Sequence, residues 1–219
     1  IPLRLVGAEM CIRDRDKSKE VVRVVKYDDD WSKLGQCSIA NENVYETFAA
    51  GPLHMAESDG ILYIHTSRYL YWDAEKDVAR IHHEVNLTYV VDEDSMECVM
   101  REAPGDWVSH SFAQYILSDG EYVYRLDLGD GNPRAVNLAK SVAYQEPDDW
   151  STWYGKTENR SLLDIIGSKG DNVTGVSLGG FELMHDGERL ITAGSSIVQD
   201  SSVTKAPIEK AYRNIFVIT

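Results

Sequence analysis

The feature that most constrains the fold of this chain is an Asp-Gly pair that recurs between apolar runs, at Asp59, Asp119 and Asp186. Asp-Gly between two such runs is a strong signal for a tight hairpin turn, because these residues tolerate the positive φ that the turn needs. Each of the three segments is therefore predicted to fold back as an antiparallel hairpin. No long stretch shows helical periodicity, so the sequence predicts an all-β protein.

Further strand-like runs surround the hairpins, and polar connectors separate them. Residues 20–27 read EVVRVVKY, which is typical of a β-strand that ends at an acidic turn. The other predicted strands lie within 31–39, 53–58, 61–65, 85–91, 98–100, 107–129, 135–138, 176–197 and 213–219. The predicted connectors are 41–52, 66–80, 144–172 and 199–212, with 161–166 read as a short strand or a turn.

The spacing of the hairpins indicates a repeat architecture. The Asp-Gly signals are 60 and 67 residues apart, which exceeds the ~40–50 residues of familiar propeller repeats by the length of the polar connectors. We therefore expect residues 16–219 to form a partial β-propeller of three to four antiparallel blades, truncated at both ends. A β-sandwich is the alternative, although it would favour more even spacing and shorter loops.

Composition excludes several classes of partner. The formal charge of −14, without a Lys/Arg cluster, argues against a nucleic-acid ligand. No apolar run approaches the ~18 residues of a membrane span. Cys37 and Cys98 form a disulfide in an oxidising compartment or are free and buried, and the free form is favoured. No Cys/His spacing suits zinc, so neither a metal nor a cofactor is expected.

Residues 5–15, LVGAEMCIRDR, resemble a translated transposase sequencing adapter at every position except Ala8. We therefore expect residues 1–15 to be non-native and the remainder to be a fragment of a metagenomic sequence. The alternative is a genuine short strand followed by a basic segment.

The candidate site follows from the second hairpin. Antiparallel pairing across the turn at Asp119 places Ser109, His110 and Ser111 beside Asp127 and Asp130, at the end opposite the turn. The corresponding end of the first unit adds further polar side chains. The candidate ligand-binding residues are His65, Arg68, His82, Asn86, Ser109, His110, Asp127, Asp130 and Arg134.

These residues also have structural interpretations. His110 would satisfy backbone groups at a strand end, and the acidic residues with Arg134 would organise a Gly-rich turn through an ion pair and side-chain hydrogen bonds. His82 and His83 cannot both point to one face of a strand. Aromatic residues in the connectors would stack on sugar rings or pack over blade edges; they are Tyr69, Tyr71, Trp72, Trp150 and Trp153.

Several segments resemble uncharacterised bacterial proteins, secreted or attached to the cell surface, that look like β-propellers. The resemblance implies the same fold and an extracellular or cell-surface location. Ala113 and Leu128 replace an aromatic or Asn residue and a His in the family pattern, so the resemblance does not imply a metal or acid-base role for this cluster. The matching segments are 21–39, 62–72, 82–92, 107–116, 127–136, 179–183 and 213–217.

Two functional hypotheses follow, with a purely structural spacer as a third. The first is a non-catalytic module that recognises a glycan or a protein through its loop face. The second is a polysaccharide hydrolase or lyase with His110, Asp127 and Asp130 as acid-base residues. Glycoside hydrolysis would require two carboxyl groups ~5–9.5 Å apart. The sequence leaves open whether the protein is an enzyme.

Overall fold

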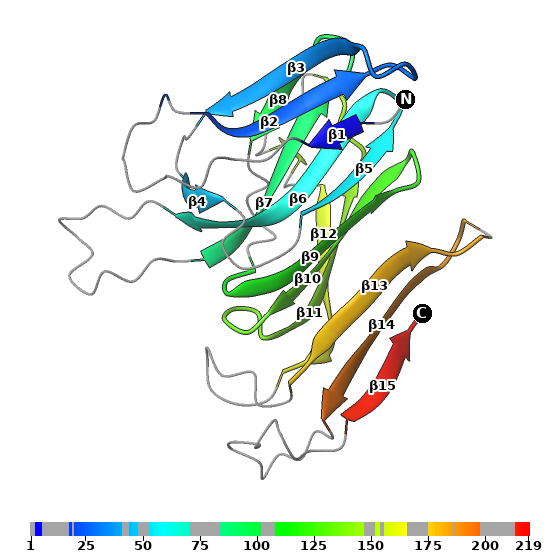
Figure 1. The fold of residues 1–219 in the computed structure, drawn as a ribbon. Helices are drawn as coiled ribbons and strands as arrows, with labels where there is room; N and C mark the ends of the chain where they lie inside the picture. Colours follow the sequence, from blue (N-terminus) through cyan, green and yellow to red (C-terminus); the bar gives the residue numbers. More distant parts are fainter. Residues whose placement is uncertain are drawn as a thin grey trace, which may run out of the picture.

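The part of the chain that the structure describes forms four antiparallel β-sheets, which succeed one another along the chain (Figure 1). The computed structural model describes residues 3–5, 18, 20–40, 44–47, 53–70, 84–101, 108–146, 152–153, 156–165, 175–185, 187–197 and 213–219. The prediction of an all-β protein is confirmed. Within these residues the four sheets do not close into a ring or a barrel.

The strands are assigned to four sheets, which we call A to D in chain order. Sheet A contains β1 (Leu3–Leu5), β2 (Glu20–Tyr27) and β3 (Lys33–Ala40). Sheet B contains β4 (Val44–Thr47), β5 (His54–Ser58), β6 (Ile61–Leu70), β7 (Glu84–Asp92) and β8 (Glu97–Arg101). Sheet C contains β9 (Ser111–Ser118), β10 (Tyr122–Gly129), β11 (Ala135–Val142) and β12 (Thr157–Asp164), and sheet D contains β13 (Ser177–Leu183), β14 (Leu190–Ile197) and β15 (Arg213–Ile218).

All three predicted hairpins are present. Strands β5 and β6 meet at Ser58↔Ile61, around Asp59 and Gly60, whose φ angles are 53° and 77°. Strands β9 and β10 are paired from Ser118↔Val123, and β13 and β14 from Leu183↔Leu190. The positive φ of the turn residues is the conformation for which Asp-Gly is selected.

Three predicted connectors contain strands instead. Strand β4 lies within 41–52, β6 continues into 66–80 as far as Leu70, and β12 lies within 144–172. The end of β6 was missed because its side chains are polar, yet Thr66, Ser67 and Arg68 are buried. The second half of β12 overlaps residues 161–166, which were read as a short strand or a turn. Its first half was missed because most of the side chains of β12 are exposed, so no apolar alternation marks it.

Strand β1 falls in the segment predicted to be non-native. It pairs with β2 from Leu3↔Lys26 to Leu5↔Val24, which extends sheet A by one short strand. This pairing fits the alternative of a genuine short strand, but it does not test where the segment comes from. The adapter origin of residues 1–15 stays a prediction.

Sheet B packs against a neighbour on each face. On one face Leu62 and Ile64 join a core with Val22, Val24 and other residues of sheet A. On the opposite face Tyr63 joins a second core with residues of sheet C. Successive side chains of a strand point to opposite faces, and a neighbouring sheet covers each face of β6. Its buried side chains therefore do not alternate with exposed polar ones.

Sheet C is likewise buried on both faces. Leu126 and Leu128 of β10 pack towards sheet D, in a cluster with Phe181. Val123 of the same strand packs towards sheet B. Asp127 and Arg125 alternate with the leucines and therefore share the face of Val123. The four sheets are stacked in the order A, B, C, D, and the polar residues of β10 face sheet B.

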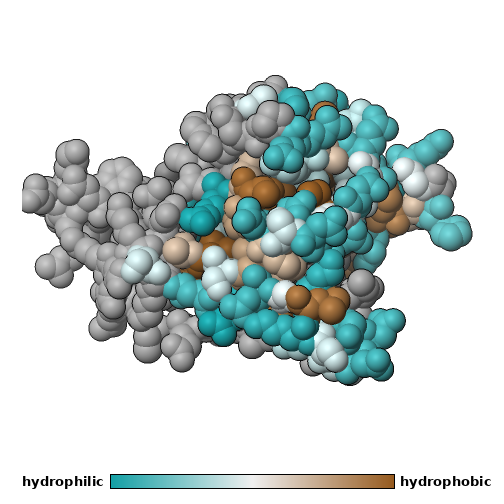
Figure 2. Space-filling view, turned by 90° about the horizontal axis from the view of Figure 1, so that it is seen from above, coloured by the Kyte–Doolittle hydropathy of each residue, from teal (hydrophilic) through white to brown (hydrophobic). Residues whose placement is uncertain are grey.

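On the face seen from above Figure 1, the described residues are mostly hydrophilic, with separate hydrophobic patches (Figure 2). Several large apolar side chains are exposed, among them Trp31, Leu34 and Ile215. Within the described part of the chain, no helix has the length and apolar character needed to cross a bilayer.

Cys37 and Cys98 are both free thiols, as favoured from the sequence. The pKa of Cys98 is raised to about 11, mainly because the thiol is buried and secondly because Cys37 lies nearby. Burial also raises the pKa of Cys37. We expect Cys98 to react slowly with iodoacetamide at pH 8, because the thiolate is the reactive form and is about 100-fold scarcer than in an unshifted thiol. Peptide mass spectrometry of native and guanidinium-unfolded protein checks this, and equal rates in both states would contradict it.

Candidate functional site

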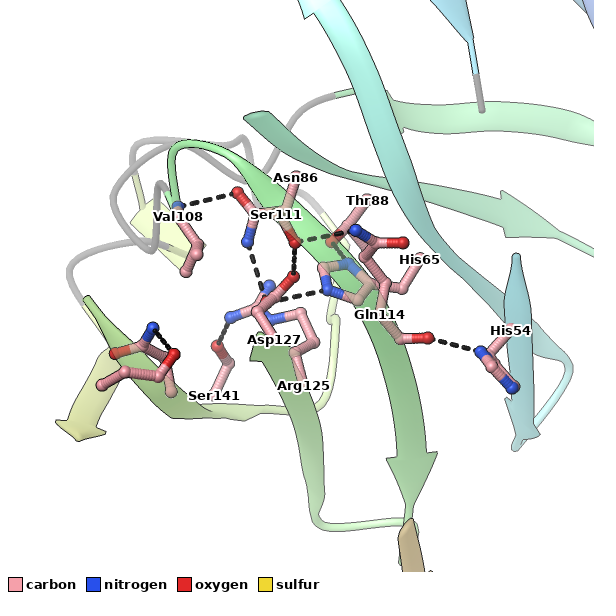
Figure 3. Close-up of polar contacts among 12 residues, drawn as sticks. His54, His65, Asn86, Thr88, Val108, Ser111, Gln114, Arg125, Asp127 and Ser141 are labelled. Atoms are coloured by element: carbon pink, nitrogen blue, oxygen red, sulfur yellow. Dashed lines mark hydrogen bonds and ion pairs between the residues drawn. The ribbon is translucent and has the colours of Figure 1, made fainter. Parts of the chain in front are cut away.

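Asp127 lies at the centre of a buried polar network between sheets B and C (Figure 3). Its side chain accepts three hydrogen bonds: Oδ1 from Ser111 Oγ at 2.9 Å, and Oδ2 from Asn86 Nδ2 at 3.0 Å and from His65 Nε2 at 3.1 Å. Asp127 is only 1% exposed, so these bonds replace those that water would make. The carboxylate therefore joins β10 to β6, β7 and β9.

A second layer of polar side chains orients these donors. His65 Nδ1 is 2.9 Å from Thr88 Oγ1, and Gln114 Nε2 donates to Ser111 Oγ at 2.7 Å. With the carboxylate on Nε2, that nitrogen carries the donated proton. The backbone carbonyl of Gln114 in turn contacts Nδ1 of His54 on β5. Contacts in this layer fix the imidazole of His65 and the hydroxyl of Ser111 relative to Asp127.

A β-bulge brings Ser111 to the correct face. Asp127 is opposite Gln114, and Leu128 is opposite Ala113, but Gly129 is opposite Ser111. Phe112 is therefore the extra residue, and it reverses the alternation beyond it. Without the bulge, Ser111 would point to the opposite face from Gln114 and could not reach the carboxylate.

The network continues into a loop at the end of sheet C. Asn86 Oδ1 accepts the Val108 amide at 3.1 Å, and the Asn86 amide donates to the Val108 carbonyl at 3.3 Å. The Ser109 amide donates to the Asn132 carbonyl at 3.1 Å, and the Asn132 amide donates to Ser109 Oγ at 2.8 Å. The Gly131 amide donates to the Ser109 carbonyl at 3.0 Å. Residues 108–109 are therefore held against both β7 and the 130–132 turn.

Gly131 is required for this close approach. A Cβ atom at this position would lie 2.2 Å from Ser109 Oγ and 2.5 Å from its carbonyl oxygen. Since both contacts are far below a van der Waals distance, a larger residue would push the two loop segments apart.

His110 is the part of this loop that reaches the surface. Its φ is 55°, in the left-handed region that costs a non-glycine residue about 1–2 kcal/mol. Its side chain is 34% exposed, and Nδ1 lies 3.4 Å from Oδ1 of Asp130, which is almost fully buried. Arg134 Nη1 donates to the Asp130 carbonyl at 2.5 Å. The structure thus presents an accessible imidazole in front of a carboxylate, in a conformation maintained by the loop hydrogen bonds.

Seven of the nine predicted candidate residues fall into two groups. His65, Asn86 and Asp127 meet in the buried network, whereas Ser109, His110, Asp130 and Arg134 lie in the loop. The three buried residues are 0%, 4% and 1% exposed, so a ligand would reach the loop rather than the network.

The two remaining predicted residues are Arg68 and His82. Arg68 is three positions from His65 on the same strand and therefore points to the opposite face, towards sheet A. His82 lies outside the described residues. Thr88 and Gln114 belong to the network but were not predicted, since single polar residues within strand-like runs give no local signal.

A second buried polar group lies on the same face of β10. Arg125 donates from Nη2 to Ser141 Oγ at 2.6 Å, and its guanidinium lies 4.4 Å from the centre of the Trp153 ring. Trp153 is buried, donates to the Val142 carbonyl at 2.6 Å and stacks on Tyr63 of sheet B. Of the two interpretations of this connector aromatic, packing is the one observed, with Trp153 in the core between sheets B and C rather than over a blade edge.

The described residues contain no group of three or more His, Cys, Asp or Glu side chains arranged to hold a metal ion. Comparisons with protein-family models, with curated proteins and with solved structures found no match to this chain.

Proposed function

We propose that this chain is a non-catalytic binding module of the β-propeller type, which recognises a glycan or protein ligand outside the cell through the loop that carries His110. The observation that carries the proposal is His110 itself. A partly exposed side chain in a left-handed backbone, fixed by a network that extends into the core, is typical of a preorganised recognition residue.

The stacking of the sheets supports the propeller. A sandwich has two layers, whereas here sheets A, B, C and D succeed one another face to face in chain order. The first strands of sheets C and D also lie side by side, since Tyr115 Oη of β9 donates to the Leu178 carbonyl of β13 at 3.4 Å. The first strand of sheet C also contacts sheet B, since His54 of β5 stacks on Tyr115 of β9 with ring centres 4.3 Å apart. Blades around a common axis would place their inner strands in this way.

The loop favours a neutral polyol as the first ligand class. An imidazole both donates and accepts hydrogen bonds, and the neighbouring Asp130 carboxylate accepts them, which suits the hydroxyl groups of a sugar. The formal charge of −14 opposes polyanionic glycans. The extracellular location rests on the resemblance of the strand segments to secreted proteins.

The surroundings of Asp127 favour binding over hydrolysis. A glycosidase needs two carboxyl groups that reach the substrate. Asp127 is buried, and both of its oxygens are engaged by Ser111, Asn86 and His65. Of the predicted pair Asp127 and Asp130, Asp130 alone lies beside the exposed imidazole of His110.

His110→Gly separates recognition from stability. Glycine removes the imidazole and the left-handed strain together, so we expect the free energy of unfolding to stay level or to rise by about 1 kcal/mol. Ligand affinity should fall at least about tenfold, which corresponds to the loss of about 1.4 kcal/mol. Denaturant unfolding measures stability, and a glycan array followed by calorimetry on the glycans that bind measures affinity.

His185→Ala is the matched control, because His185 is an exposed histidine beside the far turn of sheet D. It should retain full binding. Equal loss in both variants, or full binding by His110→Gly, would remove the loop from the proposal. Turnover of a bound glycan that disappears in Asp130→Asn would favour the polysaccharide hydrolase instead.

A further inference from the structure

Cys37 and Cys98 point into the same core, between sheets A and B. Cys37 of β3 is opposite Val24 of β2, and Cys98 of β8 is opposite Val91 of β7. Both valines belong to this core, and residues directly opposite one another share a face of the sheet. Cys37 is buried there, and the partly buried Cys98 packs against the same cluster. Each thiol therefore faces the sheet that carries the other one.

The two cysteines are also neighbours across this core. They lie on the last strands of sheets A and B, and β3 and β8 contact each other (Figure 1). The backbone amide of Cys98 donates a hydrogen bond to the sulfur of Cys37. Since Cβ is two covalent bonds from the amide nitrogen of its own residue, this sulfur lies beside the side chain of Cys98 as well. The sulfur of Cys98 donates to the Met100 carbonyl at 3.4 Å, a weak bond that is readily exchanged for another.

We propose that Cys37 and Cys98 are a redox pair, which forms a disulfide bond between sheets A and B when the chain folds in the presence of glutathione disulfide. Both are thiols in the structure, which therefore describes the reduced form. Rotation of the Cys98 side chain away from the Met100 carbonyl is the movement that we expect the bond to require. The inference goes beyond the proposed ligand-binding function, because this core lies on the opposite face of sheet B from the Asp127 network.

The reaction is an exchange of disulfides in two steps. One protein thiolate attacks glutathione disulfide, which forms a mixed disulfide and releases the first glutathione thiolate. The second protein thiolate attacks the protein sulfur of the mixed disulfide and releases the second glutathione thiolate. The pair loses two electrons and two protons, and glutathione disulfide gains them as it becomes two glutathione thiols. Burial raises the pKa of both cysteines, so the reacting thiolates are most abundant before sheets A and B pack.

The bond should stabilise the fold, because it would restrict the unfolded chain between residues 37 and 98. Oxidation and folding are linked, so folding favours the disulfide by the same factor as the disulfide favours folding. From the usual effect of a disulfide on stability, we expect this factor to be at least about 30-fold.

Refolding of the full-length Cys11→Ser variant in defined mixtures of reduced and oxidised glutathione tests the pair. The substitution leaves Cys37 and Cys98 as the only cysteines of the chain. Mass spectrometry of unreduced peptides should show the Cys37–Cys98 link as the main oxidised product. Its equilibrium constant should be at least about 30-fold larger than in the same chain kept in guanidinium. The oxidised protein should also unfold at a higher urea concentration than the reduced protein.

Cys37→Ser/Ser38→Cys in the same background is the matched control. It moves the thiol by one residue, to the exposed face of β3, and leaves the length of the enclosed loop almost unchanged. Circular dichroism should show it folded, and folding should then give its disulfide no advantage over guanidinium. A refolded Cys11→Ser chain that keeps two thiols, or carries two glutathione adducts, would overturn the proposal without reference to the control. Equal gains for the native and the shifted pair would overturn it too.

Discussion

Replacing Asp127 with alanine is expected to lower the free energy of unfolding by about 3–5 kcal/mol, because it leaves several buried polar groups without their shared partner. His65, Asn86 and Ser111 all donate to this carboxylate, and none of them is solvent-exposed. The loss is large because water cannot replace the acceptor in an interface between two packed sheets. Urea unfolding monitored by tryptophan fluorescence measures it.

Asp94→Ala provides the matched control for this change. Asp94 is an exposed aspartate in the turn between β7 and β8, and its removal should change stability by no more than about 0.5 kcal/mol. If Asp127→Ala were as mild as Asp94→Ala, the carboxylate would not be holding sheets B and C together. Asp127→Asn should fall between the two, because the amide keeps one acceptor oxygen but places a donor against the surrounding donors.

Replacing Trp153 with alanine is expected to cost about 3–5 kcal/mol, the range for removing a large aromatic from a core. Trp153 is 1% exposed and belongs to the core between sheets B and C. The truncation removes the stacking on Tyr63 and uncovers the guanidinium of Arg125. It also leaves the Val142 carbonyl without the indole N–H. The same unfolding experiment measures the effect.

Trp31→Ala is the control for the tryptophan, because Trp31 is a half-exposed residue of the turn before β3. Its replacement should cost well under half as much, since little apolar area is lost. Comparable losses at both positions would mean that Trp153 does not act as a core residue, and the connector aromatic would again be available for sugar stacking.

The local part of this fold was predictable from the sequence. Asp-Gly fixed where the hairpins turn, and antiparallel pairing then placed Ser109 and His110 beside Asp130, as the Gly131–Ser109 and Asp130–His110 hydrogen bonds confirm. These features depend on residues close in sequence, whose geometry is set by turn chemistry.

The rest depends on packing between segments far apart in the chain. His65 and Asn86 reach Asp127 because sheet B packs on sheet C, and no local pattern encodes that contact. Ser111 reaches it through a bulge at Phe112, which reverses the alternation that sequence reading assumes. Arg68 was grouped with His65 because β6 was expected to end before it, whereas the strand continues and turns Arg68 to the other face.

The central claim, that the Asp127 network holds the loop carrying His110 in place, is tested most directly by amide hydrogen exchange in the wild type and in Asp127→Ala. The Val108 amide of the loop donates to Asn86 Oδ1 on β7, and the Asn132 amide donates to Ser109 Oγ within the loop. The Tyr122 amide donates to Asp119 Oδ1 at the opposite end of sheet C. Protection factors are compared relative to the slowest-exchanging amides of each protein. In the variant, the protection factors of the Val108 and Asn132 amides should fall at least about tenfold, whereas that of the Tyr122 amide should not change. Loop amides that exchange freely in the wild type, or that are equally protected in both proteins, would contradict the account.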